Sequence, residues 1–230
     1  MAELLYIPLF GDANLVAYYR TESGALTTDS KGSFTLTNDN TVGEDAGKYG
    51  GAADFGTANT NKRLSILNDL GITGGAISIS TWVKMNTEIS TGSQTFVSQQ
   101  DTGTHVNYQI NYEYNGGTIR VGFYRNRQGI LAEAIFYTIT LGTSSWHHLV
   151  FTYDATNLRG YYNGVLVAGP TAASGNGAGT TQDYFTIGSD LGNTYVSADV
   201  DDVAVFTKAL SAEEVSTLYR EITKSYALFM

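Results

Sequence analysis

Short runs of strand-type residues, separated by glycine and asparagine turns, recur along most of this chain. In the clearest group, which begins at Trp146, such residues occupy positions 147–153 and 158–162. Asn163-Gly164 follows the second run, and both residues tolerate the positive φ that a two-residue hairpin requires. A third run, 165–167, comes directly after this turn. The pattern predicts a three-stranded antiparallel meander, which we place at the centre of a sheet.

The remaining pattern predicts more strands and one helix. Residues 77–85 alternate most clearly between two faces. Ser211 to Glu214 has the spacing of a capping box, and apolar residues follow it at helical intervals, so a helix is predicted there. Positions 64–70 are interpreted as a short helical turn. The other predicted strands lie at 14–20, 48–55, 95–100, 106–114, 118–125, 130–141, 183–188 and 199–206.

Three of these stretches resemble a known superfamily. The motif WHHLVFTYD followed by GYYNGVLV is similar to the signature of laminin-G-like and concanavalin A-like lectin and glucanase domains. ISISTWVK at 77–84 looks like the first core strand of that family, and residues 199–219 look like its closing strand and helix. The resemblance covers roughly residues 14–221 in the expected order. It implies an all-β fold, a two-sheet antiparallel jelly-roll sandwich with one short C-terminal helix.

The chain is interpreted as one domain with two apolar ends. Residues 14–222 form the predicted sandwich domain, 1–13 an apolar N-terminal arm and 223–230 an apolar C-terminal tail. Solvated tails are usually polar, so both ends are expected to be buried against something. They either fold back over their own sandwich or pack on a neighbouring subunit, which would make the protein a homo-oligomer or part of a larger assembly.

Composition removes several classes of partner. The net charge is −9 and no basic run exists, which argues against nucleic acid and anionic membranes and favours cations. Cysteine is absent, so neither a disulfide framework nor a cysteine-ligated metal site is expected. No apolar run is long enough for membrane insertion. The first residues lack the positively charged start of a signal peptide, and none is expected in this chain.

The sequence does not predict an enzyme. Catalytic relatives on this fold carry Glu-x-Asp-x-x-Glu on one strand, where alternation points all three carboxylates into a groove. That spacing is absent here. His147 and His148 are adjacent in a predicted strand and therefore face opposite sides, so they are not expected to bind one metal ion together.

A calcium site is one interpretation of the acidic closing strand. In related glucanases the first aspartate of such a run helps to hold a structural calcium ion together with backbone carbonyl groups. The resemblance therefore points to Asp201 with carbonyl groups near Gly50 or Gly51, and to the region of Asp12. Oxygen ligands of this kind suit calcium. The alternative is that the aspartates of this strand cap loops and solvate a sheet edge.

A polar face on two predicted strands is the first candidate for ligand binding. Amides, a guanidinium and a tyrosine ring suit sugar hydroxyl groups and a sugar face. A sheet face that simply contacts water would look the same. Trp82 lies on the polar face of its own strand, where it either stacks on a ligand or is covered by a loop. The residues of the candidate polar face are Asn107, Gln109, Asn111, Arg120 and Tyr124.

These observations favour a non-catalytic recognition module that binds glycan or a protein surface, as lectins and adhesion domains do. The competing class is a structural assembly protein, such as a phage virion or surface component built on this domain, and the absence of a signal peptide favours it. A glycoside hydrolase is a distant third, because the catalytic carboxylate spacing is absent and the fold alone does not decide the function. The expected location is extracellular, on a cell surface or in a virion.

Overall fold

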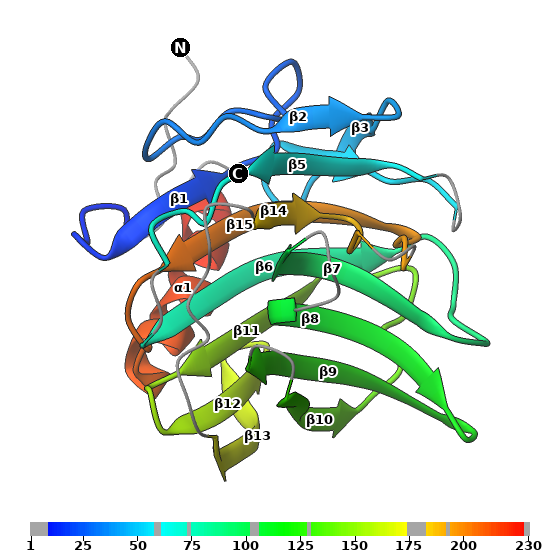
Figure 1. Ribbon diagram of the computed structural model, residues 1–230. Helices are drawn as coiled ribbons and strands as arrows, with labels where there is room; N and C mark the ends of the chain where they lie inside the picture. The colour runs from blue at the N-terminus through cyan, green and yellow to red at the C-terminus, as the bar shows by residue number, and fades with distance from the viewer. Residues whose placement is uncertain are drawn as a thin grey trace.

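The computed structural model describes residues 9–57, 61–72, 75–101, 106–127, 130–173, 183–191 and 194–227, and shows two antiparallel sheets packed face to face (Figure 1). The first sheet has the order β13-β12-β11-β6-β15-β4-β3, with β1 also paired to β15. Its strands are β1 (Leu15–Tyr19), β3 (Gly43–Ala46), β4 (Gly51–Asp54), β6 (Ile77–Met85), β11 (His147–Tyr153), β12 (Asn157–Tyr162), β13 (Val165–Ala172) and β15 (Ala198–Phe206).

The second sheet has the order β10-β9-β8-β7-β14-β5-β2. Helix α1 (Ala212–Ala227) follows the last strand of the chain. The predicted sandwich with one C-terminal helix is therefore confirmed. The strands of this sheet are β2 (Thr37–Asp39), β5 (Arg63–Leu67), β7 (Ser93–Gln100), β8 (Val106–Asn115), β9 (Thr118–Arg127), β10 (Ile130–Thr138) and β14 (Tyr184–Ile187).

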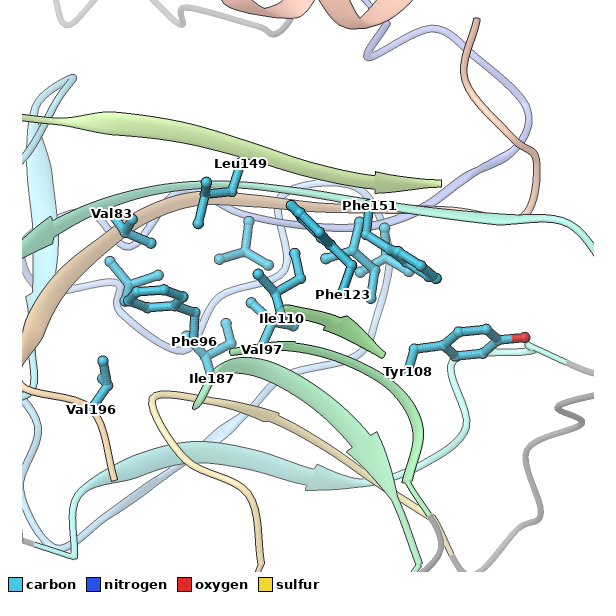
Figure 2. Close-up of a cluster of buried hydrophobic side chains, with 14 of the residues drawn as sticks. Val83, Phe96, Val97, Tyr108, Ile110, Phe123, Leu149, Phe151, Ile187 and Val196 are labelled. Atoms are coloured by element: carbon cyan, nitrogen blue, oxygen red, sulfur yellow. The ribbon is translucent and has the colours of Figure 1, made fainter. Parts of the chain in front are cut away.

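The core lies between the two sheets because the strands present their apolar residues to the inside. In β8, Tyr108, Ile110 and Tyr112 are fully buried. Phe123 of β9 stacks on Phe151 of β11 across the sandwich, with ring centroids 6.3 Å apart. Figure 2 shows Ile110, Phe123 and Phe151 among the buried side chains between the sheets. The alternation of β8 consequently directs its polar residues to the outer face of the second sheet.

The meander from β11 to β13 forms as predicted, but at one end of its sheet. Asn163 and Gly164 have positive φ values of 47° and 79°, as the hairpin turn requires. On its other side β11 pairs with β6, and the sheet continues from there to β15 and β4. The predicted central position is therefore wrong, and β13 is an edge strand.

The helical turn predicted at 64–70 is also wrong. The structure has strand β5 there, paired with β14 on one side and β2 on the other. Leu64 is fully buried while Leu67 is 49% exposed, which is a strand pattern. The predicted capping box is confirmed, since Ser211 N–H donates to Glu214 Oε2 at 2.8 Å and Glu214 N–H to Ser211 Oγ at 3.2 Å.

The described end of the N-terminal arm folds back onto its own domain. Leu9 and Phe10 are partly buried against a cluster that includes Tyr18. The ring of Phe10 meets that of Tyr18 edge to face at 6.3 Å, and the Lys31 ammonium lies 5.3 Å from the Phe10 centroid. Most of the arm and the end of the tail lie outside the described residues. Within them, α1 is the only helix, and it lacks the length and apolar character to cross a bilayer.

Candidate functional site

The candidate polar face is assembled on β8, β9 and β10. Gln109 lies opposite Tyr124, and Glu113 lies opposite Arg120. Because the inner positions of these strands are filled by core residues, the side chains of these paired positions share the outer face. The structure therefore brings the predicted residues together on one surface of the second sheet.

The three amides of this face are buried in internal hydrogen bonds. Asn107 Nδ2 donates to Asp183 Oδ2 at 2.5 Å. Gln109 Nε2 donates to the Thr95 hydroxyl at 2.8 Å. That hydroxyl donates in turn to Asn111 Oδ1 at 3.0 Å. The exposed fraction of the three amide residues is only 4–7%. The alternative of a sheet face that simply contacts water is therefore wrong at these positions, where the amides hold the sheet surface together.

The accessible part of the face is a cluster that we call the ring patch, consisting of Glu113, Arg120, Tyr124 and Phe136. Arg120 Nε donates to Glu113 Oε1 at 2.7 Å, and the Tyr124 hydroxyl lies 2.9 Å from both oxygens of that carboxylate. The Arg120 guanidinium lies 3.7 Å from the Phe136 centroid. Burial and the Glu113 charge raise the pKa of Tyr124 well above its usual value, so the hydroxyl stays protonated as a donor.

A glycine beneath the ring patch lets the aromatic rings lie on the sheet. Gly122 is the outward residue between Arg120 and Tyr124. A Cβ atom there would stand 2.5 Å from Cε2 of Tyr124 and 3.2 Å from Cε1 of Phe136. The two rings meet edge to face at 5.6 Å, and Phe136 is 38% exposed. Sequence reasoning missed Phe136 because the register of β10 decides which of its residues face outward.

Trp82 lies on the other side of the molecule and is covered. It belongs to β6 of the first sheet, and only 2% of its surface is exposed. The ring of Tyr219 from α1 stacks on it at 5.6 Å, and the Lys48 ammonium lies 4.7 Å from its centroid. Its predicted role in ligand binding is therefore wrong, and the alternative of a covered tryptophan is confirmed, with the helix as the cover.

His147 and His148 face opposite sides, as predicted. His147 Nδ1 lies 2.8 Å from the Tyr162 hydroxyl. His148 Nε2 lies 2.8 Å from the Ser80 hydroxyl, beneath α1. Burial, followed by the positive charge of Lys48, lowers the pKa of His148 to about 3. Both imidazoles serve packing, and His148 is neutral at neutral pH.

The closing strand β15 brings Asp201 to the loop before β4. Asp201 is fully buried, and its Oδ2 accepts a hydrogen bond from Tyr49 N–H at 3.1 Å. A Cβ atom on Gly47 would stand 2.0 Å from the Gly51 carbonyl oxygen and 2.7 Å from Asp201 Oδ2, so these two oxygens are neighbours. Burial, reinforced by the charge of Asp202, raises the pKa of Asp201.

Asp12 does not join this site. Its carboxylate pairs with Lys208, just before α1, and that hydrogen bond lowers its pKa to about 2. Leu15 pairs with Phe206 and Tyr19 with Val203, so Asp12 and Asp201 lie beyond opposite ends of β1. Asp201 and the Gly50–Gly51 loop meet as predicted, whereas the placement of Asp12 beside them is wrong.

The aspartates of β15 do not solvate a sheet edge. Asp199 is fully buried and pairs with Lys84 at 2.7 Å. Asp202 is 6% exposed, has a φ of 49° at an irregularity of β15, and accepts a hydrogen bond from the Tyr18 hydroxyl. Burial raises the pKa of Asp202 to about 7. Within the described parts of the chain, no three histidine, cysteine or acidic side chains are grouped to hold a metal ion.

Comparison with known proteins agrees with this architecture. Residues 55–216 match the family described as the concanavalin A-like lectin/glucanases superfamily, and the chain belongs to it. No curated protein matches the sequence.

Solved structures share the fold at low identity. Domain 4 of AbnA, a GH43 extracellular arabinanase from Geobacillus stearothermophilus in complex with arabinotriose, is 21% identical with a TM-score of 0.67; the match covers 90% of this chain and 98% of that one. The binding domain of botulinum neurotoxin DC in complex with SialylT is 13% identical with a TM-score of 0.70, covering 93% and 52%. The serotype G binding domain is 17% identical with a TM-score of 0.67, covering 90% and 50%. This chain thus spans about half of the neurotoxin binding domains.

Proposed function

We propose that this chain is a non-catalytic recognition module that binds glycan on the outer face of its second sheet. The observation that carries the proposal is the ring patch, where an exposed aromatic ring lies beside a guanidinium and a carboxylate. Aromatic faces stack on the apolar face of a sugar, while the two charged groups donate to and accept from its hydroxyl groups. The lectin-like fold and a structural relative solved with arabinotriose support the same class of ligand.

The ring patch is suited to recognition and not to bond cleavage. Glu113 accepts hydrogen bonds from both Arg120 and Tyr124, which fixes its position beside the rings. A glycosidase needs a second carboxylate at a set separation, one of the pair acting as an acid. The sequence lacks the strand spacing that would supply this pair. The proposed activity is therefore binding without hydrolysis.

Removing a ring of the ring patch is expected to weaken glycan binding. Phe136→Ala and Tyr124→Ala should each lower affinity by roughly two- to tenfold, because one aromatic contact contributes roughly 0.5–1.5 kcal/mol. A glycan array with neutral and sialylated glycans first identifies the ligand, and calorimetry then measures each variant. Tyr114→Ala is the control, since Tyr114 is equally exposed at 38% but lies outside the ring patch. An array without signal would contradict the proposed function, and unchanged affinity in both variants would exclude this face.

A structural calcium ion is the second part of the proposal. Asp201 Oδ2 and the Gly51 carbonyl oxygen would be its protein ligands, and oxygen donors of these two kinds suit calcium. The raised pKa of the buried Asp201 supports the assignment, because a divalent cation would compensate a carboxylate charge that is otherwise costly to bury. Such an ion would tie β15 to the loop before β4.

Calcium is therefore expected to raise the melting temperature. An ion at a hundredfold excess over its Kd would stabilise the folded state by about 2.7 kcal/mol, which corresponds to roughly 5–10 °C for a domain of this size. Thermal melting with calcium and with a chelator measures the shift. Asp201→Asn should abolish it, whereas Asp12→Asn, at the other end of β1, should respond like the parent. An identical midpoint with calcium and chelator would contradict the site.

A structural assembly protein remains the second candidate, and an exposed apolar hairpin favours it. Val165 and Leu166, at the start of edge strand β13, are 63% and 42% exposed. Clustered exposed apolar residues often mark contacts between proteins. A component of a virion or surface layer would use this edge to pack on a further copy. Light scattering at micromolar concentration separates the two functions, because a monomer would contradict self-assembly through this edge and leave glycan binding intact. Both candidates place the protein outside the cell, on a cell surface or in a virion.

A further inference from the structure

A hollow lies beside the start of β7, and we call it the rim cleft. Its volume is about 480 Å³. One wall is the loop that connects β6 to β7, residues 87–92, together with Ser93 and Gln94 at the start of β7. Thr194 and Tyr195, from the segment between β14 and β15, form the other wall. The rim cleft shares no residue with the ring patch.

Both walls of the rim cleft are fixed by contacts with the body of the sandwich. In the loop, Ile89 is 4% exposed and belongs to the core between the sheets. The Tyr112 hydroxyl donates to Glu88 Oε2 at 3.3 Å, and Tyr114 N–H donates to the Gly92 carbonyl oxygen at 2.9 Å. Thr95 N–H donates to the Thr194 carbonyl oxygen at 2.9 Å and holds the second wall. A preformed cavity binds a ligand without a large ordering cost.

The lining of the rim cleft matches a neutral polyhydroxylated ligand. Its polar side chains are mainly hydroxyls from serine and threonine, with the Glu88 carboxylate as an acceptor and the half-buried Tyr195 ring as an apolar surface. None of the lining residues that the structure describes is cationic, and the chain carries a net charge of −9, so an anionic ligand is disfavoured. The Ser93 hydroxyl oxygen is buried and has no hydrogen-bond partner within the described structure. Buried polar groups normally have one, so a ligand hydroxyl would satisfy it.

One row of residues across the sheet connects the rim cleft with the ring patch. Ser93 of β7 lies opposite Glu113 of β8, which lies opposite Arg120 of β9. These three residues share the outer face. Neighbouring strands are about 4.8 Å apart, so the row from Ser93 to Arg120 spans roughly 10 Å. An oligosaccharide of a few residues bound at the ring patch can therefore reach the cleft.

We propose that the rim cleft binds a terminal residue of the neutral oligosaccharide whose adjoining residues bind the ring patch. This assignment rests on the proposed function and extends it by giving the ligand a charge class, a direction and a minimum length. The Tyr195 ring would pack against the sugar face, the Ser93 hydroxyl and Glu88 would bond its hydroxyl groups, and Glu113 would lie between the two subsites.

Calorimetry with two oligosaccharide ladders tests the assignment. The probes are arabinose to arabinotetraose and glucose to cellotetraose, with sialyllactose as the anionic comparison. For the unaltered chain, affinity should rise at least tenfold when the sugar becomes long enough to enter the cleft, and sialyllactose should bind more weakly. Tyr195→Ala should remove that rise and leave the affinity for shorter sugars unchanged, whereas Tyr124→Ala should lower affinity at every length.

A milder variant and a control keep the test decisive if Tyr195→Ala unfolds the chain. Ser93→Ala removes only the unpartnered hydroxyl and should reduce the length-dependent rise about threefold, with an unchanged melting temperature. Tyr114→Ala should behave like the unaltered chain. If the length-dependent rise in affinity persists in both Tyr195→Ala and Ser93→Ala, the assignment of the rim cleft is overturned, while that of the ring patch is not. If the glycan array is positive but neither ladder binds, the rim cleft assignment is overturned and the proposed function is not. If the array shows no signal, the proposed function is overturned as well.

Discussion

Gly188→Ala is expected to destabilise the fold strongly, although it adds only one methyl group. Gly188 follows β14 and has a φ of 88°, and an added Cβ atom would stand 2.0 Å from Cε1 of Phe55. Phe55 is fully buried in the core, and protein interiors are close-packed, so its ring cannot move aside freely. The backbone strain and the overpacking together should lower the free energy of unfolding by about 4 kcal/mol, which corresponds to roughly 8–16 °C in Tm.

Urea unfolding measures this loss, and another glycine provides the matched control. Gly117 has a φ of 89° but nothing within 4 Å of an added Cβ atom. Gly117→Ala should therefore cost only the backbone term, about 1 kcal/mol. Phe55→Leu should cost less in the Gly188→Ala background than alone, because the smaller side chain relieves the clash. Equal losses for the two glycine variants would contradict the role assigned to Phe55.

The sandwich could be predicted from sequence because its strands carry a local signal. Alternation in 106–114 and 118–125 identified the inward residues, and Tyr108, Ile110 and Phe123 are indeed fully buried. The hairpin at Asn163-Gly164 and the capping box at Ser211 are also local, and both formed as predicted. Each of these features depends on residues close together in the chain, so no knowledge of the register between distant strands was needed.

The candidate site was harder to predict because its exposure depends on distant segments. The amides of Asn107 and Asn111 are on the predicted face, but they are buried by contacts with Asp183 and the hydroxyl of Thr95. Nothing in the alternation of β8 shows that these partners are close. The register of β10 against β9 likewise decides that Phe136 lies over Gly122. Both features depend on tertiary contacts between distant segments, which the pattern of a single sequence does not reveal.

Arg125 shows the same limit on the inner face. It is the next inward residue of β9 after Phe123 and is fully buried, although arginine side chains are rarely buried in proteins. Its guanidinium lies 4.0 Å from the Tyr153 centroid and pairs with Glu133 at 3.3 Å. Glu133 comes from β10, the neighbouring strand of the same sheet, and Tyr153 from β11 of the first sheet. The compensation for burying the charge is therefore complete only when β9 pairs with β10 and the two sheets pack together.

Acidification is expected to destabilise the fold through His148. This imidazole is completely buried against Trp82 and Tyr219, at ring distances of 4.9 and 6.0 Å, and its pKa is lowered from 6.5 to about 3. Between pH 6.5 and pH 3 the unfolded state therefore binds a proton at His148 that the folded state does not bind. The contribution of the neutral His148 to the stability is fully present above pH 6.5 and is lost as the pH falls toward 3. The loss at pH 4 should reach roughly 3 kcal/mol.

A variant that cannot titrate isolates this effect from opposing groups. Asp202 has a raised pKa of about 7, so its contribution to stability falls as the pH rises toward that value, opposite in sign to that of His148. His148→Phe keeps a ring against Trp82 and Tyr219 and removes the titration, while the contribution of Asp202 remains. Urea unfolding at pH 7 and at pH 4 should show that the unaltered chain loses roughly 3 kcal/mol more than the variant. The same loss in both chains would mean that His148 is protonated in the folded state, and that α1 does not exclude water from it.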